Sequence, residues 1–465
     1  MQDTRGSSPA RPEHRGLLST LAGALGRRAA RIFPFLRQRR AAVTPALPPP
    51  RSWQPRSAVM LVPDDRIDRR VLLEARSLVR AGWRVTVVGA PPPFPGYTHD
   101  EESFPEVEIL RVDASRAQAV PDELRSPVHP PGETDWVDFY WLTNHYYLLG
   151  ASRPSQVVVA HDLPVLPAAI MAAARHGALL VYDAHELYPE QHHFGPAWIE
   201  RYRKAETSIA KLADRVITVN QSIAREMVTR YGVAAPEVIL NCPDVTPSAL
   251  PTASGNELRQ ELQIPARQRI LLFQGGMSLN RNLEALVAAM GHVQRDDVVL
   301  VLMGPGNEKR RELEGIARDA RTLGRRVFFR DAVAQKDLLR YCRSADAGMI
   351  PYPHIDLNSY YCTPNKLFDF LVVGLPILAN DSPELRRFVA EQGVGMVHPM
   401  TDARAIAAGI DMFFSGDLAA YRIRLRDVGS RFTWEHEGDL VVRIYEDLIT
   451  RGARDWARVE DPDNR

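Results

Sequence analysis

The chain has 465 residues, of which 45% are hydrophobic and 25% charged, so it has a globular composition and is too long for a single core; two domains are expected. Its 58 basic and 57 acidic residues nearly cancel, which argues against a nucleic-acid-binding protein. Three scattered cysteines exclude a disulfide framework and favour a reducing compartment. We therefore expect a cytoplasmic protein.

Residues 1–56 form a basic, proline-rich N-terminal extension. Leucine and isoleucine recur at near-helical spacing over residues 16–40 and alternate with arginine, a pattern typical of an amphipathic helix on an anionic membrane surface. Alternatives are a disordered basic tail or a targeting segment, which the prolines between 45 and 50 favour. The first interpretation would place the protein peripherally at the inner face of the cytoplasmic membrane.

From residue 57 the pattern changes to alternating strands and helices. An apolar run at 58–62, helical periodicity over 69–81 and an apolar run at 85–88 form a βαβ unit, which predicts a parallel sheet. No GxGxxG motif follows the first run, so an NAD-type site is disfavoured. Further strands of this first domain, assigned to 57–250, are expected at 107–112, 157–160, 179–182 and 216–219, helices at 136–147 and 222–231, and a linker at 243–255.

Two polar clusters directly follow predicted strands of the first domain. His161 and Asp162 follow one strand, and Asp183, His185 and Glu186 follow the next. Open α/β sheets bind their ligands at the carboxyl ends of the strands. A single histidine is more often structural than catalytic, but two histidine-acid pairs at equivalent positions predict that at least one lies in the active cleft.

The second domain, assigned to 251–431, repeats the same alternation. A strand at 270–273 leads into a loop with Gly275 and Gly276, whose backbone amides can approach an anion closely, while Arg281 can pair with it. A Gly-Gly loop alone is a weak signal. Further elements are predicted at 283–292, 298–303, 327–329 and 347–351, followed by a terminal helix at about 432–450 and a charged tail at 451–465.

The segment 360–378 predicts a loop, a short helix and a Gly-Leu-Pro turn into a buried strand. Pro364 suits the first helical turn, and the amides from Thr363 through Asn365 to Lys366 are free to face an anion. Lys366 and Asp369 are three residues apart and share one helix face, the cation suited to phosphates and the carboxylate to ribose hydroxyls. The alternative is a surface ion pair, which the surrounding apolar residues disfavour.

Several segments together resemble the retaining glycosyltransferases of family four. They are residues 160–164, 182–187, 213–219, 241–243, 274–276 with Arg281, and 364–370, within a match from about 59 to 448. The resemblance implies the α/β GT-B fold, two Rossmann-like domains whose parallel sheets face each other across a cleft, with the terminal helix crossing back to the first. It implies a nucleotide-diphosphate sugar as donor substrate, a glycan or glycolipid as acceptor, and neither metal nor cofactor.

The resemblance also assigns the donor site. Asp369 stands at the second glutamate of the family's E-x7-E motif and would bind the ribose, whereas the first glutamate falls at Tyr361, which cannot play the same ionic part. Arg281 occupies the position at which the family usually carries a lysine, and it would hold the diphosphate together with Lys366. The arginine that many relatives carry earlier in that loop falls at Gly276, so Lys366 is expected to do its work.

On the first-domain side, the resemblance places His185, or as second choice His161, beside the transferred sugar, with Asp162 and Glu186 on the acceptor side. The implied reaction transfers a hexosyl-type sugar with retention of anomeric configuration. A nucleotide-sugar 2-epimerase is an alternative with the same architecture, since extra carboxylates are present in the predicted cleft. A catalytically silent binding subunit is another.

Overall fold

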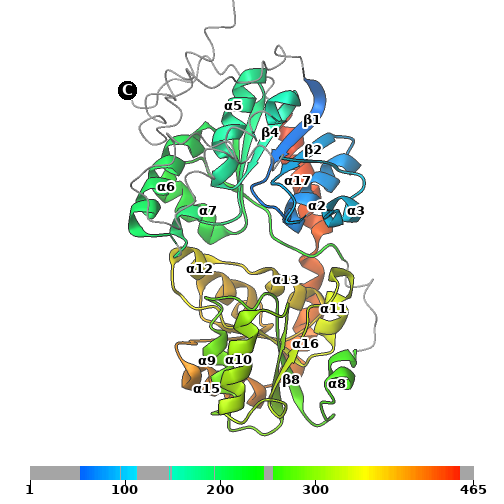
Figure 1. Cartoon of the computed structure of the whole chain (residues 1–465), viewed down its shortest axis with the longest axis vertical. Helices are drawn as coiled ribbons and strands as arrows, with labels where there is room; N and C mark the ends of the chain where they lie inside the picture. Colours follow the sequence, from blue (N-terminus) through cyan, green and yellow to red (C-terminus); the bar gives the residue numbers. More distant parts are fainter. Residues whose placement is uncertain are drawn as a thin grey trace, which may run out of the picture.

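The computed structural model describes residues 53–94, 96–112, 146, 149–192, 194–245 and 255–450. It shows two α/β domains stacked along the long axis, each built around one parallel sheet (Figure 1). This confirms the expectation of two Rossmann-like domains. The segment 16–40, the predicted helix 136–147 except Tyr146, and the tail 451–465 lie outside the described residues.

The first sheet has seven strands in the order β3-β2-β1-β4-β5-β6-β7, and every neighbouring pair is parallel. Because helices cover both faces, the central strands are continuous apolar runs, and β4 is buried along its whole length. Strand β1 begins at Gln54, slightly before the boundary assigned from sequence. The strands are β1 (Gln54–Leu61), β2 (Arg84–Gly89), β3 (Glu108–Arg111), β4 (Ser155–His161), β5 (Leu179–Ala184), β6 (Arg215–Thr218) and β7 (Glu237–Val238), and the α-helices α2 (Arg69–Arg80), α3 (His99–Ser103), α5 (Leu166–His176), α6 (Pro196–Ile209) and α7 (Gln221–Tyr231).

The second sheet has six strands in the order β10-β9-β8-β11-β12-β13 and is wound in the same way. In both sheets the strand order reverses beside the first strand, between β1 and β4 and between β8 and β11, and such switch points are where ligands bind. The strands are β8 (Arg269–Gln274), β9 (Val298–Met303), β10 (Val327–Arg330), β11 (Ala347–Ile350), β12 (Ile377–Asn380) and β13 (Gly395–His398), and the α-helices α8 (Glu257–Glu261), α9 (Leu283–Ala289), α10 (Glu308–Asp319), α11 (Gln335–Arg343), α12 (Leu357–Tyr361), α13 (Asn365–Val372), α14 (Pro383–Leu385), α15 (Ala403–Ser415) and α16 (Leu418–Val428).

The segment around α12 and α13 differs from the sequence prediction in two details. Residues leading to Cys362 were expected to be a loop, but Leu357–Tyr361 form the helix α12, because the carboxylate of Asp356 accepts a hydrogen bond from the amide of Ser359 and caps it. Pro364 is the residue before α13 and does not lie in its first turn. No element was predicted between 380 and 431, where the structure has β13 and α14 to α16.

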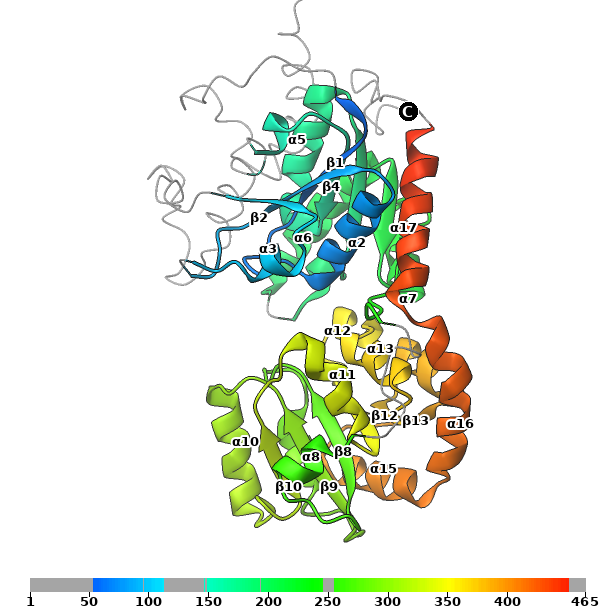
Figure 2. The same cartoon turned by 90° about the vertical axis from the view of Figure 1, so that its right-hand side faces the viewer.

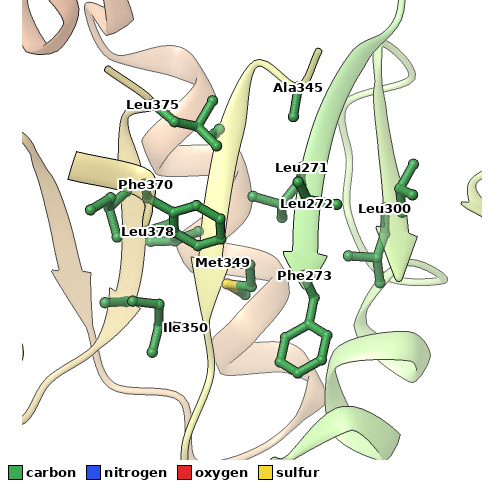
Figure 3. Close-up of a cluster of buried hydrophobic side chains, with 14 of the residues drawn as sticks. Leu271, Leu272, Phe273, Leu300, Ala345, Met349, Ile350, Phe370, Leu375 and Leu378 are labelled. Carbon is green, nitrogen blue, oxygen red and sulfur yellow. The ribbon is translucent and has the colours of Figure 1, made fainter. Parts of the chain in front are cut away.

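Helix α13 is fixed to the second sheet by its apolar residues. The ring of Phe370 lies against Gly348 of β11, where a Cβ atom would come within 2.4 Å of the ring, so only glycine permits this approach. Figure 3 shows Phe370 beside Leu378 and next to the strand that carries Met349. This anchoring leaves the start of α13 to face the first domain.

Helix α17 (Trp434–Ile449) joins the two domains. It follows α16 of the second domain but runs along the first, as Figure 2 shows. Its residues Val441, Ile444 and Leu448 belong to the same buried cluster as residues of β1 and α2. Within the described part of the chain, no helix has the length and apolar character to cross a membrane.

Candidate active site

A cavity of about 420 Å³ lies between the two domains. The second domain contributes the loop after β8, Tyr352 after β11 and the start of α13, and the first contributes the start of α2 and residues 241–243. Most of these segments follow the carboxyl ends of central strands, where both sheets have their switch points. The cavity is therefore where a doubly wound fold is expected to bind its ligand.

The glycine loop after β8 forms one wall of the cavity. Gly275 has φ +121°, a conformation that favours glycine, and a Cβ on Gly304 would lie 2.1 Å from the Gly275 carbonyl oxygen, so the two glycines pack backbone to backbone. A Cβ built on Gly276 meets no heavy atom within 4 Å. The loop thus exposes backbone to the cavity, as a phosphate cradle requires.

Lys366 and Arg281 are brought together on one tyrosine. The Nζ atom of Lys366 donates a hydrogen bond to Tyr352 Oη at 2.7 Å and lies 4.0 Å from the ring centroid of Phe273. The guanidinium of Arg281 stacks 4.3 Å from the ring centroid of Tyr352. Burial, together with nearby Arg281, lowers the pKa of Lys366 well below its usual value. Of the two, Arg281 is therefore the stronger candidate to pair with an anion in the cavity.

Asp369 faces the same cavity from α13. Its side chain is buried and accepts a hydrogen bond from Gln274 Nε2 at 2.9 Å. Burial raises its pKa to about 7, against opposing effects from Arg69, the Gln274 hydrogen bond and Lys366. Among the described residues, Lys366 and Asp369 form no ion pair with each other, and both are buried, so the surface ion pair considered from sequence does not occur.

Thr363 and Asn365, also assigned to the donor site, make contacts across the domain boundary. The Nδ2 atom of Asn220 donates to the carbonyl oxygen of Tyr361 at 2.8 Å and to Thr363 Oγ1 at 3.3 Å. The Nδ2 atom of Asn241 donates to Asn365 Oδ1 at 3.2 Å. Asn365 lines the cavity, whereas the Thr363 hydroxyl is turned toward the first domain.

The two histidines meet on one carboxylate. His161 is the last residue of β4 and is paired in register with Asp183, the last but one residue of β5. Asp183 Oδ2 lies 3.1 Å from both His161 Nδ1 and His185 Nε2. Arg70 donates to Asp183 Oδ1 at 3.0 Å and pairs with Glu74 at 2.9 Å. These four groups, and Glu74, form a buried charged network behind the cavity wall.

The network holds His185 as a cation. Although burial opposes its charge, Asp183 and Asp162 raise the pKa of His185 to about 10, whereas burial lowers the pKa of His161. Burial likewise opposes ionisation of Asp183, but Arg70 and His185 bring its pKa well below the usual range. His185 therefore acts as a hydrogen-bond donor and positive charge and not as a general base.

His161, Asp183 and His185 also have the composition of a metal site, since one ligand atom from each lies within 4.8 Å of the others. Arg70 occupies the same carboxylate, however, and places a positive charge where a metal ion would need the negative charge of Asp183. We interpret the three residues as a hydrogen-bond network.

The acceptor-side carboxylates are engaged within the protein. Asp162 Oδ1 accepts a hydrogen bond from the amide of His185 at 2.8 Å. Glu186 Oε1 accepts from Gln191 Nε2 at 2.6 Å, and Oε2 accepts from Asn358 Nδ2 of α12 at 2.9 Å. Neither these residues nor the two histidines line the 420 Å³ cavity, which Arg70 separates from the network.

Several residues of the cavity were not assigned to the site from sequence. Arg69 and Arg70 begin α2, the first helix after β1, and Tyr352 follows β11. All three obey the rule that ligand-binding groups follow the carboxyl ends of strands, so the rule that selected the histidines could have selected them. Trp434 enters from α17, and no sequence pattern indicates that contact.

Two family models match the chain. Residues 67–243 match the glycosyl transferase 4-like domain, and residues 268–415 match the glycosyl transferases group 1 domain, together well over half of the chain. The chain belongs to the group 1 glycosyltransferases. It is 23% identical over 358 residues to a D-inositol 3-phosphate glycosyltransferase of Xylanimonas cellulosilytica, covering 74% of this chain and 76% of that one. It is 25% identical over 163 residues to a phosphatidyl-myo-inositol mannosyltransferase of Mycobacterium leprae, covering 34% of this chain and 40% of the relative.

Solved structures of the same fold superpose on this glycosyltransferase. A sucrose-phosphate synthase from Thermosynechococcus elongatus has a TM-score of 0.66 at 18% identity, covering 85% of this chain and 100% of that one. Anabaena Alr3699/HepE in complex with UDP has a TM-score of 0.64 at 16% identity, covering 84% and 100%. At these identities the likeness shows the fold alone, which is GT-B.

Proposed function

We propose that this glycosyltransferase takes its sugar from a nucleotide-diphosphate donor held by the second domain and transfers it with retention of anomeric configuration. The observation that carries the proposal is the interdomain cavity, in which an open glycine loop, Arg281 and the carboxylate of Asp369 converge. Exposed backbone and a guanidinium suit a diphosphate, and a carboxylate suits ribose hydroxyls.

In the proposed reaction, the bond between the anomeric carbon and the diphosphate oxygen breaks, and its electron pair leaves with the nucleoside diphosphate. An acceptor hydroxyl forms the new bond on the same face, and its proton passes to the leaving phosphate. Negative charge therefore grows on the diphosphate, where Arg281 stabilises it; two unit charges about 4 Å apart attract by roughly 4 kcal/mol at an effective dielectric of about 20. No metal is part of this proposal.

The acceptor is proposed from chemistry and from the relatives together. Curated relatives are named for D-inositol 3-phosphate and phosphatidyl-myo-inositol, both phosphorylated polyols. We infer that the acceptor is a polyol, glycan or glycolipid that enters from the first-domain side. The carboxylates of that domain accept hydrogen bonds from protein donors, so hydroxyl recognition would fall to backbone and to His185, whose Nε2 contacts Asp183 but whose Nδ1 lies 3.8 Å from Asp162 Oδ2.

The 2-epimerase alternative loses the feature that favoured it. Its support from sequence was the set of carboxylates Asp162, Asp183 and Glu186, and the structure shows each of them bound by protein donors. Whether the protein is instead a catalytically silent binding subunit is decided by measuring whether it consumes a donor.

A panel of nucleotide sugars tests the proposal. We expect slow hydrolysis of one donor without acceptor, faster consumption with a polyol or glycan acceptor, a product of unchanged anomeric configuration by NMR, and activity that persists in EDTA. Isomerised donor would instead support the epimerase, and donor binding without consumption would support the silent subunit.

Attachment to an anionic membrane through residues 16–40 stays a prediction, because that segment lies outside the described residues. The intact chain is expected to sediment with phosphatidylglycerol vesicles, and a chain that begins at residue 53, just before β1, is expected not to. Equal sedimentation of both would contradict the prediction.

A further inference from the structure

Arg69 is a cation of the first domain that faces the donor cavity, and none of the residues that the structure describes forms an ion pair with it. It begins α2 and lines the cavity beside Arg70. Arg70 is fully committed to Asp183 and Glu74. The Nε atom of Arg69, in contrast, is buried and has no hydrogen-bond partner, and within the described ranges no carboxylate lies within ion-pair distance of this side chain.

An unpaired, largely buried guanidinium is unfavourable for the folded protein by itself. Burial lowers the pKa of Arg69, and Asp244 and Asp369 offset this only in part. Asp244 is already paired with Arg76 at 2.5 Å. A cation kept in this state at a cavity wall is expected where an anionic ligand supplies the missing partner.

The opposite wall offers less positive charge than the sequence implies. Lys366 donates a hydrogen bond to Tyr352 and packs on Phe273, and burial lowers its pKa. Position 276 is a glycine and carries no side chain. Arg281 is left as the dependable cation of the second domain. The negative charges of a diphosphate therefore lack a second strong partner on the wall that holds the glycine loop.

We propose that Arg69 binds the diphosphate of the donor from the first-domain side and, with Arg281, clamps it between the two domains. This inference rests on the proposed function and adds a catalytic residue to it. Charge that develops on the leaving diphosphate is then shared between guanidinium groups from both domains, so that the leaving group is stabilised only when the domains are closed on it.

Calorimetry on the full chain tests the clamp with UDP, GDP and ADP and with the matching nucleosides. We expect Arg69→Ala to weaken binding of the preferred diphosphate about 10-fold to 100-fold, as loss of a charged hydrogen bond does, and to leave nucleoside affinity unchanged. Arg69→Gln, which keeps most of the side-chain length, is expected to show the same loss. Arg80→Ala is the matched control, because Arg80 ends the same helix and is exposed.

A second variant separates phosphate binding from a purely structural role. A side chain at 276 has open space and faces the same cavity, so Gly276→Arg can supply a guanidinium from the other domain. We expect it to restore part of the diphosphate affinity lost in Arg69→Ala, which a structural defect in α2 would not permit.

The outcomes are distinguishable. A wild-type chain that binds none of the diphosphates overturns the proposed function and this inference with it. If the wild-type chain binds a diphosphate and Arg69→Ala binds it equally well, the clamp alone is overturned. The same holds if Arg69→Ala loses affinity for the nucleoside and for the diphosphate alike.

Discussion

Charged groups at the switch point of the first domain pair with one another, whereas Arg281, Lys366 and Asp369 of the second domain form no ion pairs within the described part of the chain. Arg70, Asp183 and His185 form a closed network of short contacts. Arg281 forms no ion pair with any described residue, and the space beyond Gly276 is open. Paired charges fix the position of catalytic groups, while unpaired cations, Arg281 here and Arg69 in the first domain, are left for a ligand.

Breaking the first-domain network should have the largest effect on stability. Arg70→Ala leaves the carboxylate of Asp183 buried without its cation, and we expect the free energy of unfolding to fall by about 3–5 kcal/mol. Urea unfolding measures this, with Arg80→Ala of the same helix as a control expected to change it by no more than about 0.5 kcal/mol. A loss below about 1 kcal/mol for Arg70→Ala would show that the network is not a closed unit.

His185 tests whether positioning and binding are separable. We expect His185→Ala to lower turnover about 100-fold to 1,000-fold, as removal of a preorganised donor does, and to leave the dissociation constant of the nucleoside diphosphate within about twofold. The exposed His436→Ala on α17 serves as control. Equal losses in turnover and affinity would place His185 in the binding half of the site.

Asp369 gives a pH dependence of stability. Its pKa is raised to about 7, so the folded protein keeps this proton in a range where the unfolded chain, with a pKa of about 4, releases it. Folding thus takes up a proton, and the free energy of unfolding falls as pH rises from about 4 to about 7.

Asp369→Asn removes this contribution, so we expect its free energy of unfolding to decline less steeply across that window, by up to about 1.4 kcal/mol per pH unit. Urea unfolding at a series of pH values measures both slopes. Asp427→Asn, an exposed site on α16, should keep the wild-type slope. Identical slopes for all three chains would show that Asp369 is not buried as a protonated acid.

The smallest effect on the free energy of unfolding is expected where α12 contacts the first domain. Asn358 donates to Glu186 and accepts from the amide of Leu187 at 3.0 Å, and each hydrogen bond contributes about 0.5–1.5 kcal/mol. Asn358→Ala should lower the free energy of unfolding by that order, and Asn358→Asp by more, because two carboxylates would face each other. A fully neutral Asn358→Asp would contradict the contact.

Much of the fold was predictable because parallel strands buried on both faces must be continuous apolar runs, as at 58–62 and 298–303. The shared face of Lys366 and Asp369 followed from helical spacing alone. Helix α12 could not be predicted from spacing, because five residues are too few to show a periodicity. This helix depends on its Asp356 cap and on contacts with the first domain.

The electrostatics of the site could not be predicted for a similar reason. The state of Lys366 depends on Phe273 of β8 and on Tyr352, which follows β11. That of His185 depends on the register between β4 and β5. Sequence therefore located the charged groups of the site, but their pairing is a property of the tertiary structure.

The most direct test of the account is a crystal structure of the full chain with the nucleoside diphosphate that it binds best. We expect the diphosphate to lie against the Gly275–Gly276 backbone and Arg281, with the ribose hydroxyls on Asp369. A nucleotide bound elsewhere, or one in the cavity with its ribose turned away from Asp369, would contradict the assignment of binding to the second domain.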